Sequence, residues 1–290
     1  MVVRFSHMDI ARCTRALLPF VIAGLVAITS TLALAQSDPG CGGETIPCQI
    51  ADGSGGQYYV MPPRGWDGVS PLPVLMFFHG YGATGQVFVK SQNMQRIARR
   101  GGFLLVAPDG LNKTWAHQGS PSNLRNEMAY VDALLADLKQ RFPIDDRRMW
   151  AGGFSQGGSM VWDLACKRGD LFQAYVPIAG GFWNPMPTNC PAGPVNILHI
   201  HGLQDSTVPM EGRPIGSSWH QGDIRLGFEV WKQEAGCSVR PQRSDSRGRL
   251  RCDKWTTCTS GKTLALCLHD GGHSLPQGWS DEAYRFLNSL

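Results

Sequence analysis

The chain has 290 residues, with 27 Lys and Arg against 23 Asp and Glu, so its formal net charge is +4. This charge is small and evenly spread, which gives no reason to expect nucleic acid as a partner. A hydrophobic share of 42%, with 35 Gly and 19 Pro, is ordinary for a globular protein and excludes disorder, coiled coil and collagen.

The first 35 residues have the pattern of a signal peptide. Three arginines precede an apolar run over residues 17–34, and Ala33-Leu34-Ala35 has the small-x-small form of a cleavage site. A membrane anchor is the alternative, but the run is short for a spanning helix and Pro19 interrupts it. We therefore expect residues 1–35 to be removed and residues 36–290 to be secreted or periplasmic, with no membrane partner.

Nine cysteines are present, and cleavage would remove one of them, Cys13. An even set of eight in an exported chain predicts four disulfides. Counting leaves about 105 possible pairings. Proximity along the chain favours Cys41–Cys48, Cys166–Cys190, Cys237–Cys258 and Cys252–Cys267, the last across a predicted hairpin. Because no C-x2-C pair occurs, we do not expect a zinc site.

Strand-like apolar segments alternate with helix-like segments along the rest of the chain. Residues 73–79 (PVLMFFH) form a near-continuous apolar run, typical of a strand buried on both faces of a parallel sheet. Further strands are predicted over 103–107, 148–152, 175–179, 195–201 and 262–269, and helices over 87–100, 126–141, 156–168, 224–236 and 281–290. This alternation predicts an α/β fold, a doubly wound and mostly parallel sheet in a single domain, with ligands at the carboxyl ends of the strands.

Residues 153–157 (GFSQG) form a G-x-S-x-G motif between a predicted strand and a predicted helix. A tight strand-to-helix turn exposes the hydroxyl of its serine, Ser155, and glycines on either side let the two backbones pass closely. The bare pattern is weak, and a Gly-rich structural turn is the alternative. Its placement in the α/β alternation makes Ser155 the candidate nucleophile.

A serine nucleophile needs a base, and the base needs an orienting acid. Asp205 and His273 each follow a predicted strand, in the order Ser, acid, His that α/β-hydrolases use. Asp109 precedes the serine, and Asp270 is too close to His273 to be its obvious partner. Asp205 is therefore the predicted acid, and the scheme needs no cofactor.

Two backbone N–H groups should stabilise the oxyanion. One is expected from Gln156, the residue after the nucleophile. The other should come from the loop after strand 73–79, with Tyr81 as the predicted donor and Gly82 as its alternate. His79 is expected to hold this loop in place.

Several other residues are weaker candidates. Trp115 and Trp183 lie in loops after strands, so either could line the substrate pocket, although ordinary packing is the alternative. His199 and His201 share one face of a strand and could bind a metal. No acidic ligand at matching spacing supports such a site, so we expect no metal.

Five segments carry a resemblance to a known family. They are FHGYG (residues 78–82), VAPDG (106–110), GFSQGG (153–158), HIHG with Asp205 (199–205) and GGH (271–273). On these segments the chain resembles the secreted esterases grouped as polyhydroxybutyrate depolymerase-like and feruloyl esterase-like enzymes, over about residues 55–280. The family often has an aromatic residue and proline after the catalytic histidine, whereas Ser274-Leu275-Pro276 follows His273 here, which leaves the shape of the alcohol-side pocket open.

The resemblance implies an α/β-hydrolase fold and a secreted serine esterase. Its expected substrates are hydroxybutyrate-type polyester oligomers, or feruloyl or acetyl esters of plant cell-wall polysaccharide. An exported serine peptidase and a non-catalytic binding protein on the same fold are the alternatives.

Overall fold

The computed structural model describes residues 41–51 and 56–290. The predicted signal peptide, residues 1–35, and its cleavage site after Ala35 lie outside the described residues. Among the residues that are described, no helix has both the length and the apolar character needed to cross a membrane.

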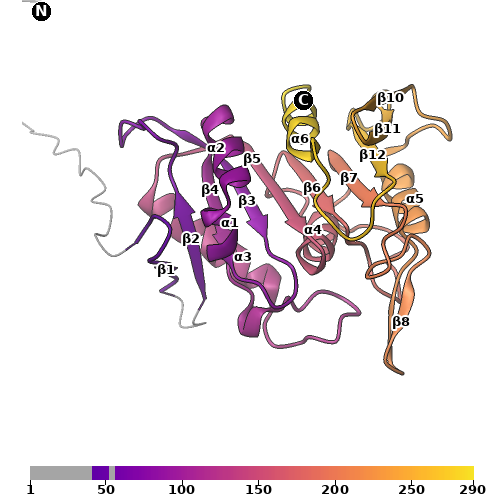
Figure 1. Cartoon of the computed structure of the whole chain (residues 1–290), viewed down its shortest axis with the longest axis horizontal. Coiled ribbons are helices and arrows are strands. Elements are labelled where there is room, and N and C mark those ends of the chain that lie inside the picture. Colours follow the sequence, from indigo (N-terminus) through magenta and orange to yellow (C-terminus); the bar gives the residue numbers. More distant parts are fainter. Residues whose placement is uncertain (1–40, 52–55) are drawn as a thin grey trace, which may run out of the picture. The chain divides into compact units, whose positions relative to one another are not determined.

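Ten strands form one sheet in the order β1-β2-β4-β3-β5-β6-β7-β12-β11-β10 (Figure 1). Its strands are β1 (Cys48–Gln49), β2 (Gln57–Met61), β3 (Leu72–Phe78), β4 (Leu104–Pro108), β5 (Ile144–Phe154), β6 (Ala174–Ile178), β7 (Ile197–Gly202), β10 (Arg243–Arg247), β11 (Leu250–Trp255) and β12 (Leu264–His269). The strands from β4 to β12 in this order are parallel to their neighbours, and antiparallel strands flank them at both ends. The predicted α/β fold with a mostly parallel sheet is confirmed.

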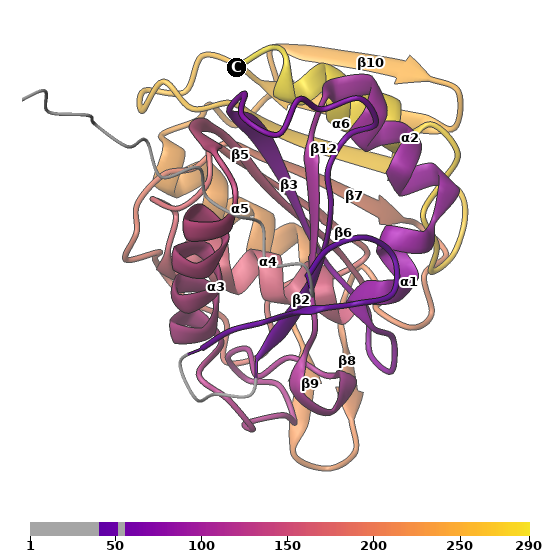
Figure 2. The same ribbon diagram turned by 90° about the vertical axis from the view of Figure 1, so that its left-hand side faces the viewer.

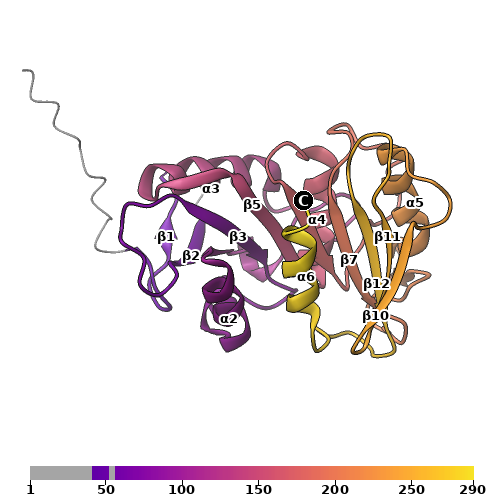
Figure 3. The same ribbon diagram turned by 90° about the horizontal axis from the view of Figure 1, so that it is seen from above.

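Helices cover both faces of this sheet. They are α1 (Gly85–Lys90), α2 (Gln92–Gly101), the short 3-10 helix η1 (Leu111–Lys113), α3 (Glu127–Arg141), α4 (Gln156–Lys167), α5 (Ile224–Ala235) and α6 (Trp279–Leu287). Figures 2 and 3 show α2 and α6 on one face and α3 and α5 on the other. A separate two-stranded sheet consists of β8 (Arg213–Ile215) and β9 (Trp219–Gln221).

The core explains the apolar run of β3. Every residue of this strand is buried, and its side chains alternate between two apolar clusters. Met76 and Phe78 pack on the side of α3, α4 and α5, whereas Leu75 and Phe77 pack on the side of α1, α2 and α6. Burial on both faces therefore requires apolar residues at successive positions.

The antiparallel end of the sheet carries charges and a disulfide. The edge strand β10 is mostly exposed and polar, which discourages pairing with another chain. Cys252 of β11 lies directly opposite Cys267 of β12. The structure contains the disulfides Cys41–Cys48, Cys166–Cys190, Cys237–Cys258 and Cys252–Cys267, the same pairs that the sequence favours.

Two predicted helices differ in the structure. The helix expected over residues 87–100 is two helices, because Ser91 adopts an extended conformation between α1 and α2. The last helix begins at Trp279 and ends at Leu287, earlier than predicted at both ends. The short strands β2, β8 and β9 were not predicted.

Candidate active site

Ser155 occupies a strained turn between β5 and α4. Its φ of 58° and ψ of −123° are rarely adopted by a residue with a side chain. The neighbouring glycines explain how the chain tolerates this turn. A Cβ on Gly153 would lie 2.3 Å from Gly157 O, and one on Gly157 would lie 2.1 Å from Phe78 O. Only glycine therefore allows the strand and the helix to approach so closely.

The three predicted triad residues meet at the carboxyl ends of the strands. Asp205 lies in the turn after β7, and His273 lies in the loop after β12. His273 Nδ1 is 2.7 Å from Asp205 Oδ2, and His273 Nε2 is 2.8 Å from Ser155 Oγ. Because a carboxylate only accepts hydrogen bonds, Nδ1–H donates to Asp205 and Nε2 is left to accept from the serine hydroxyl. The imidazole thus has the tautomer that a general base requires.

Asp205 is held rigidly and in its charged form. Its Oδ1 accepts hydrogen bonds from the backbone N–H groups of Thr207, at 2.9 Å, and Val208, at 2.8 Å. Burial by itself would raise the pKa of Asp205, but the hydrogen bonds from His273 and Val208 outweigh burial and hold the pKa below its usual value. The carboxylate is therefore ionised at neutral pH.

A buried chain of hydrogen bonds supports the loop that carries Asp205. His201 Nε2 is 2.8 Å from Val208 O, an acceptor, so this nitrogen carries the hydrogen. His201 Nδ1 then accepts from His199 Nε2 at 3.0 Å, and His199 Nδ1 accepts from the Trp162 indole N–H at 3.2 Å. Burial lowers the pKa of both histidines, so both rings are neutral. Val208 is thereby held by its carbonyl while its N–H binds Asp205.

No group of side chains in the described part of the chain suits a metal ion. The four ring nitrogens of the histidine pair are all used in the hydrogen bonds above. Cys252, Cys267 and Glu282 also lie close together. Their two sulfur atoms are joined in a disulfide, however, and the carboxylate is paired with two basic side chains.

The geometry favours Tyr81 over Gly82 as the second oxyanion donor. The N–H of Gly82 is engaged, since it donates to Lys113 O at 2.9 Å. The N–H of Tyr81 has no acceptor among the described residues. Gln156 is the first residue of α4, so its N–H has no acceptor within the helix.

His79 fixes the peptide that carries the Tyr81 N–H. Gly110 N–H donates to His79 Nε2 at 2.9 Å, so Nδ1 carries the hydrogen and donates to Gly80 O at 2.8 Å. The C=O of Gly80 and the N–H of Tyr81 point in opposite directions across one trans peptide. By holding the carbonyl, His79 sets the direction of the N–H, which is the structural role expected from the sequence.

Trp115 does not line the cleft, contrary to the sequence-based expectation. Its side chain is fully buried and packs on Phe78, with ring centroids 5.2 Å apart. Its indole N–H donates to His79 O at 2.7 Å. Trp115 therefore supports the oxyanion loop from the core, because the loop after β4 folds back over the sheet.

A cleft of about 620 Å³ opens over Ser155. One wall is the loop over residues 121–124, and the other is the β8–β9 hairpin, which projects from the sheet in Figures 1 and 2. Trp183, the second predicted tryptophan, does line this cleft. Sequence reasoning missed Arg213 and Gln221, which the hairpin brings to the same cleft.

The competing acids are engaged elsewhere. Asp109 Oδ1 accepts from Gly85 N–H at 2.5 Å, and its Oδ2 accepts from the Gln57 side chain at 2.7 Å. Asp270 is exposed and forms a two-pronged pair with Arg251, at 2.7 and 3.1 Å. Asp205 is the carboxylate that contacts the imidazole.

A model of the phospholipase/carboxylesterase family matches residues 68–216, just over half of the chain, including Ser155 and Asp205. The chain belongs to this family. This phospholipase/carboxylesterase family member is a feruloyl esterase-like α/β-hydrolase and a serine carboxylic ester hydrolase, as its relatives also indicate.

Two of these relatives are fungal. The probable feruloyl esterase C of Aspergillus niger is 27% identical over 271 residues, covering 90% of this chain and 91% of that protein. The feruloyl esterase C of Emericella nidulans is 29% identical, covering 82% of this chain and 83% of its own. Among solved structures, the acetyl xylan esterase from Aspergillus awamori matches with a TM-score of 0.61 at 12% identity, over 81% of this chain and 94% of that chain. At this identity the structural match supports the fold alone.

Proposed function

We propose that this family member hydrolyses esters through a covalent acyl-enzyme on Ser155, with His273 as base and Asp205 as the orienting acid. The observation that carries the proposal is the unbroken hydrogen-bonded chain from Ser155 Oγ through His273 to Asp205. The strained serine turn supplies another part that acyl transfer needs, and so do the backbone N–H groups of Gln156 and Tyr81, which have no acceptor among the described residues.

The reaction proceeds in two acyl transfers. Ser155 Oγ attacks the ester carbonyl carbon while its proton passes to His273 Nε2, and the N–H groups of Gln156 and Tyr81 stabilise the oxyanion. Collapse of this intermediate breaks the ester bond, and the departing alcohol takes the proton from His273. A water molecule then attacks the acyl-enzyme by the same route, releasing the carboxylic acid and restoring the serine hydroxyl.

The proposed substrates are hydroxycinnamoyl esters of plant cell-wall polysaccharide. Relatives named feruloyl esterase support this class over hydroxybutyrate oligomers. The cleft supports it as well, because Trp183 is one of its lining residues and pairs with Gln221 through an isolated β-bridge. An aromatic acyl group can pack against the indole ring, which an acetyl or hydroxybutyryl group cannot do as fully.

The Gln221 side chain fits the phenolic hydroxyl of such an acyl group. Gln221 is only 6% exposed, and its Oε1 is buried without a hydrogen-bond partner among the described residues. An amide left unsatisfied in this way costs about 1–3 kcal/mol. A hydroxyl both donates and accepts, so it can satisfy the amide in either orientation of the side chain.

Gln221→Leu should lower kcat/KM for methyl p-coumarate about tenfold, because a hydrogen bond in a cleft contributes about 1.5 kcal/mol. Methyl cinnamate lacks the phenolic hydroxyl, so the substitution should change kcat/KM for this ester little. Steady-state kinetics of the wild type and of Gln221→Leu on both esters give the comparison directly. An equal loss on the two esters would show that Gln221 only shapes the cleft. Wild-type preference for hydroxybutyrate oligomers over both aryl esters would contradict the proposed substrate and leave the Ser155 mechanism intact.

We also propose that the protein works outside the cytoplasm, as one catalytic domain over residues 36–290 after removal of residues 1–35. The four disulfides support this compartment, because such bonds persist in oxidising environments. The amino-terminal sequence of the exported protein tests it, and a first residue other than Gln36 would contradict the predicted cleavage site.

A further inference from the structure

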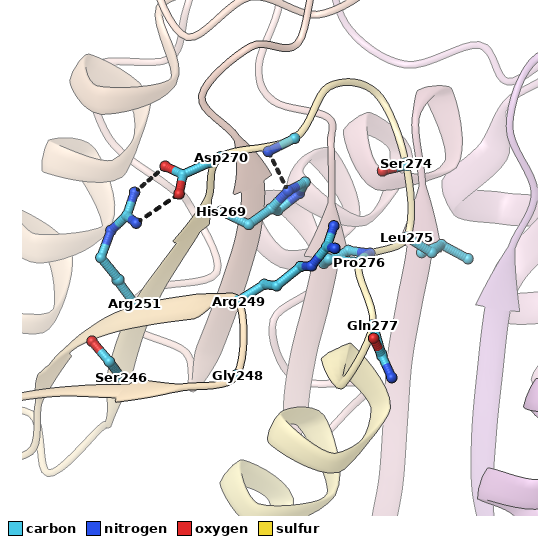
Figure 4. Close-up of a pocket in the computed structure, with 11 residues that line it drawn as sticks. Ser246, Gly248, Arg249, Arg251, His269, Asp270, Ser274, Leu275, Pro276 and Gln277 are labelled. Carbon is cyan, nitrogen blue, oxygen red and sulfur yellow. Dashed lines mark hydrogen bonds and ion pairs between the residues drawn. The ribbon is translucent and has the colours of Figure 1, made fainter.

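A second cavity of about 620 Å³ lies beside the loop that carries His273. Gly271 and Ser274 of this loop line it, on either side of His273, whose Nε2 lies 2.8 Å from Ser155 Oγ in the catalytic cleft. Its other walls are the turn between β10 and β11 and the segment that leads into α6 (Figure 4).

His269 contributes a donor that the protein leaves unused. Gly271 N–H donates to His269 Nδ1 at 3.1 Å, so the hydrogen of the neutral ring is on Nε2. Burial lowers the pKa of His269, which keeps the ring neutral. The residue is 3% exposed, and its Nε2 has no acceptor in the described part of the chain. A buried donor of this kind calls for a ligand or another explanation.

Arg249 adds a positive charge to the same cavity. Figure 4 shows its side chain extending toward the His269 ring, and its charge is close enough to oppose protonation of that ring. The only carboxylate in the wall, Asp270, is already neutralised by its two-pronged pair with Arg251. No carboxylate of the described residues pairs with Arg249. The cavity therefore has a net positive charge and an unused N–H donor.

We propose that this cavity binds the carboxylate of a uronic acid unit on the polysaccharide whose ester occupies the cleft. The proposal rests on the proposed function, since the catalytic cleft must hold the ester of the same chain. A carboxylate has two acceptor oxygens, one for the Arg249 guanidinium and one for His269 Nε2–H. Arginines on an exposed edge hairpin are expected for solubility alone, but that explanation does not account for the buried histidine donor.

The test is binding, measured by affinity electrophoresis in native gels that contain polygalacturonate or, as a reference, neutral arabinan. Arg249→Gln should weaken binding to polygalacturonate about threefold to fivefold, the scale of one exposed charge pair. Arg247→Gln is the matched control, because it removes the same charge from the same hairpin outside the cavity. This variant should bind like the wild type, and none of the three proteins should be retarded by arabinan.

Equal losses in the two variants would overturn the proposal, because they would show diffuse attraction to a basic hairpin. Competition by inorganic phosphate as strong as that of trigalacturonate, at equal ionic strength, would overturn the choice of a carboxylate. Binding of polygalacturonate needs no turnover, so this test is independent of whether the protein hydrolyses esters. A protein that hydrolyses methyl p-coumarate but ignores polygalacturonate would refute this inference and leave the proposed function standing.

Discussion

Replacing Ser155 with alanine should lower kcat for methyl p-coumarate by about 10⁵- to 10⁶-fold, the scale seen when a triad nucleophile is removed. Alanine has no oxygen to attack the ester, and His273 then has no proton to take. The turn itself should survive, because the glycines on either side still permit the close approach of β5 and α4. Burst-phase release of p-nitrophenol from p-nitrophenyl acetate should also disappear.

Ser159→Ala is the matched control for this variant. Ser159 lines the same cleft and its hydroxyl accepts the Gly181 N–H at 3.1 Å, a structural contact. Loss of this hydrogen bond should lower the free energy of unfolding by about 1 kcal/mol and leave kcat unchanged. Full ester turnover by Ser155→Ala, after removal of contaminating wild type, would show that the nucleophile is another residue.

Asp205→Asn should lower kcat about 10³- to 10⁴-fold. The backbone N–H groups of Thr207 and Val208 both donate to one oxygen of Asp205. In the variant they will keep the amide oxygen, so the amide nitrogen faces His273. The imidazole must then accept at Nδ1 and carry its hydrogen on Nε2, the wrong tautomer for a base.

Asp270→Asn is the control for the acid, because Asp270 lies three residues from His273 but pairs with Arg251 at the surface. The kcat of this variant should stay within about threefold of the wild-type value, since an exposed ion pair contributes little to stability. Measuring kcat and the unfolding midpoint for both variants separates catalysis from stability. A larger loss of kcat in Asp270→Asn than in Asp205→Asn would reverse the assignment.

The triad residues could be found from the sequence because each follows a strand that is easy to recognise. Ser155 directly follows β5, and Asp205 and His273 lie three and four residues after β7 and β12. Parallel strands present their carboxyl ends at one edge of the sheet. The oxyanion loop can be found in the same way, because it follows β3. The sequence cannot decide whether Tyr81 or Gly82 donates the second N–H to the oxyanion. That choice depends on the hydrogen bond from Gly82 N–H to Lys113 O, and Lys113 lies far along the chain.

The walls of the cleft could not be predicted, because they depend on loop courses. Trp115 and Trp183 both follow strands. Trp115, however, is buried beneath the oxyanion loop, between Phe78 and Tyr130. Gln221 lies on a strand of three residues, too short to show a periodic pattern. The hairpin that brings it to Ser155 is therefore visible only in the structure.

Ser155 Oγ should be the atom that attacks the substrate. Covalent trapping with a p-nitrophenyl phosphonate ester tests it most directly, because phosphorus bound to the serine oxygen mimics the tetrahedral intermediate. Peptide mass spectrometry should find one adduct, on Ser155, formed quickly by the wild type, slowly by Asp205→Asn and not at all by Ser155→Ala. A stable adduct on any other residue, with loss of ester hydrolysis in proportion to its formation, would show that Ser155 is not the nucleophile.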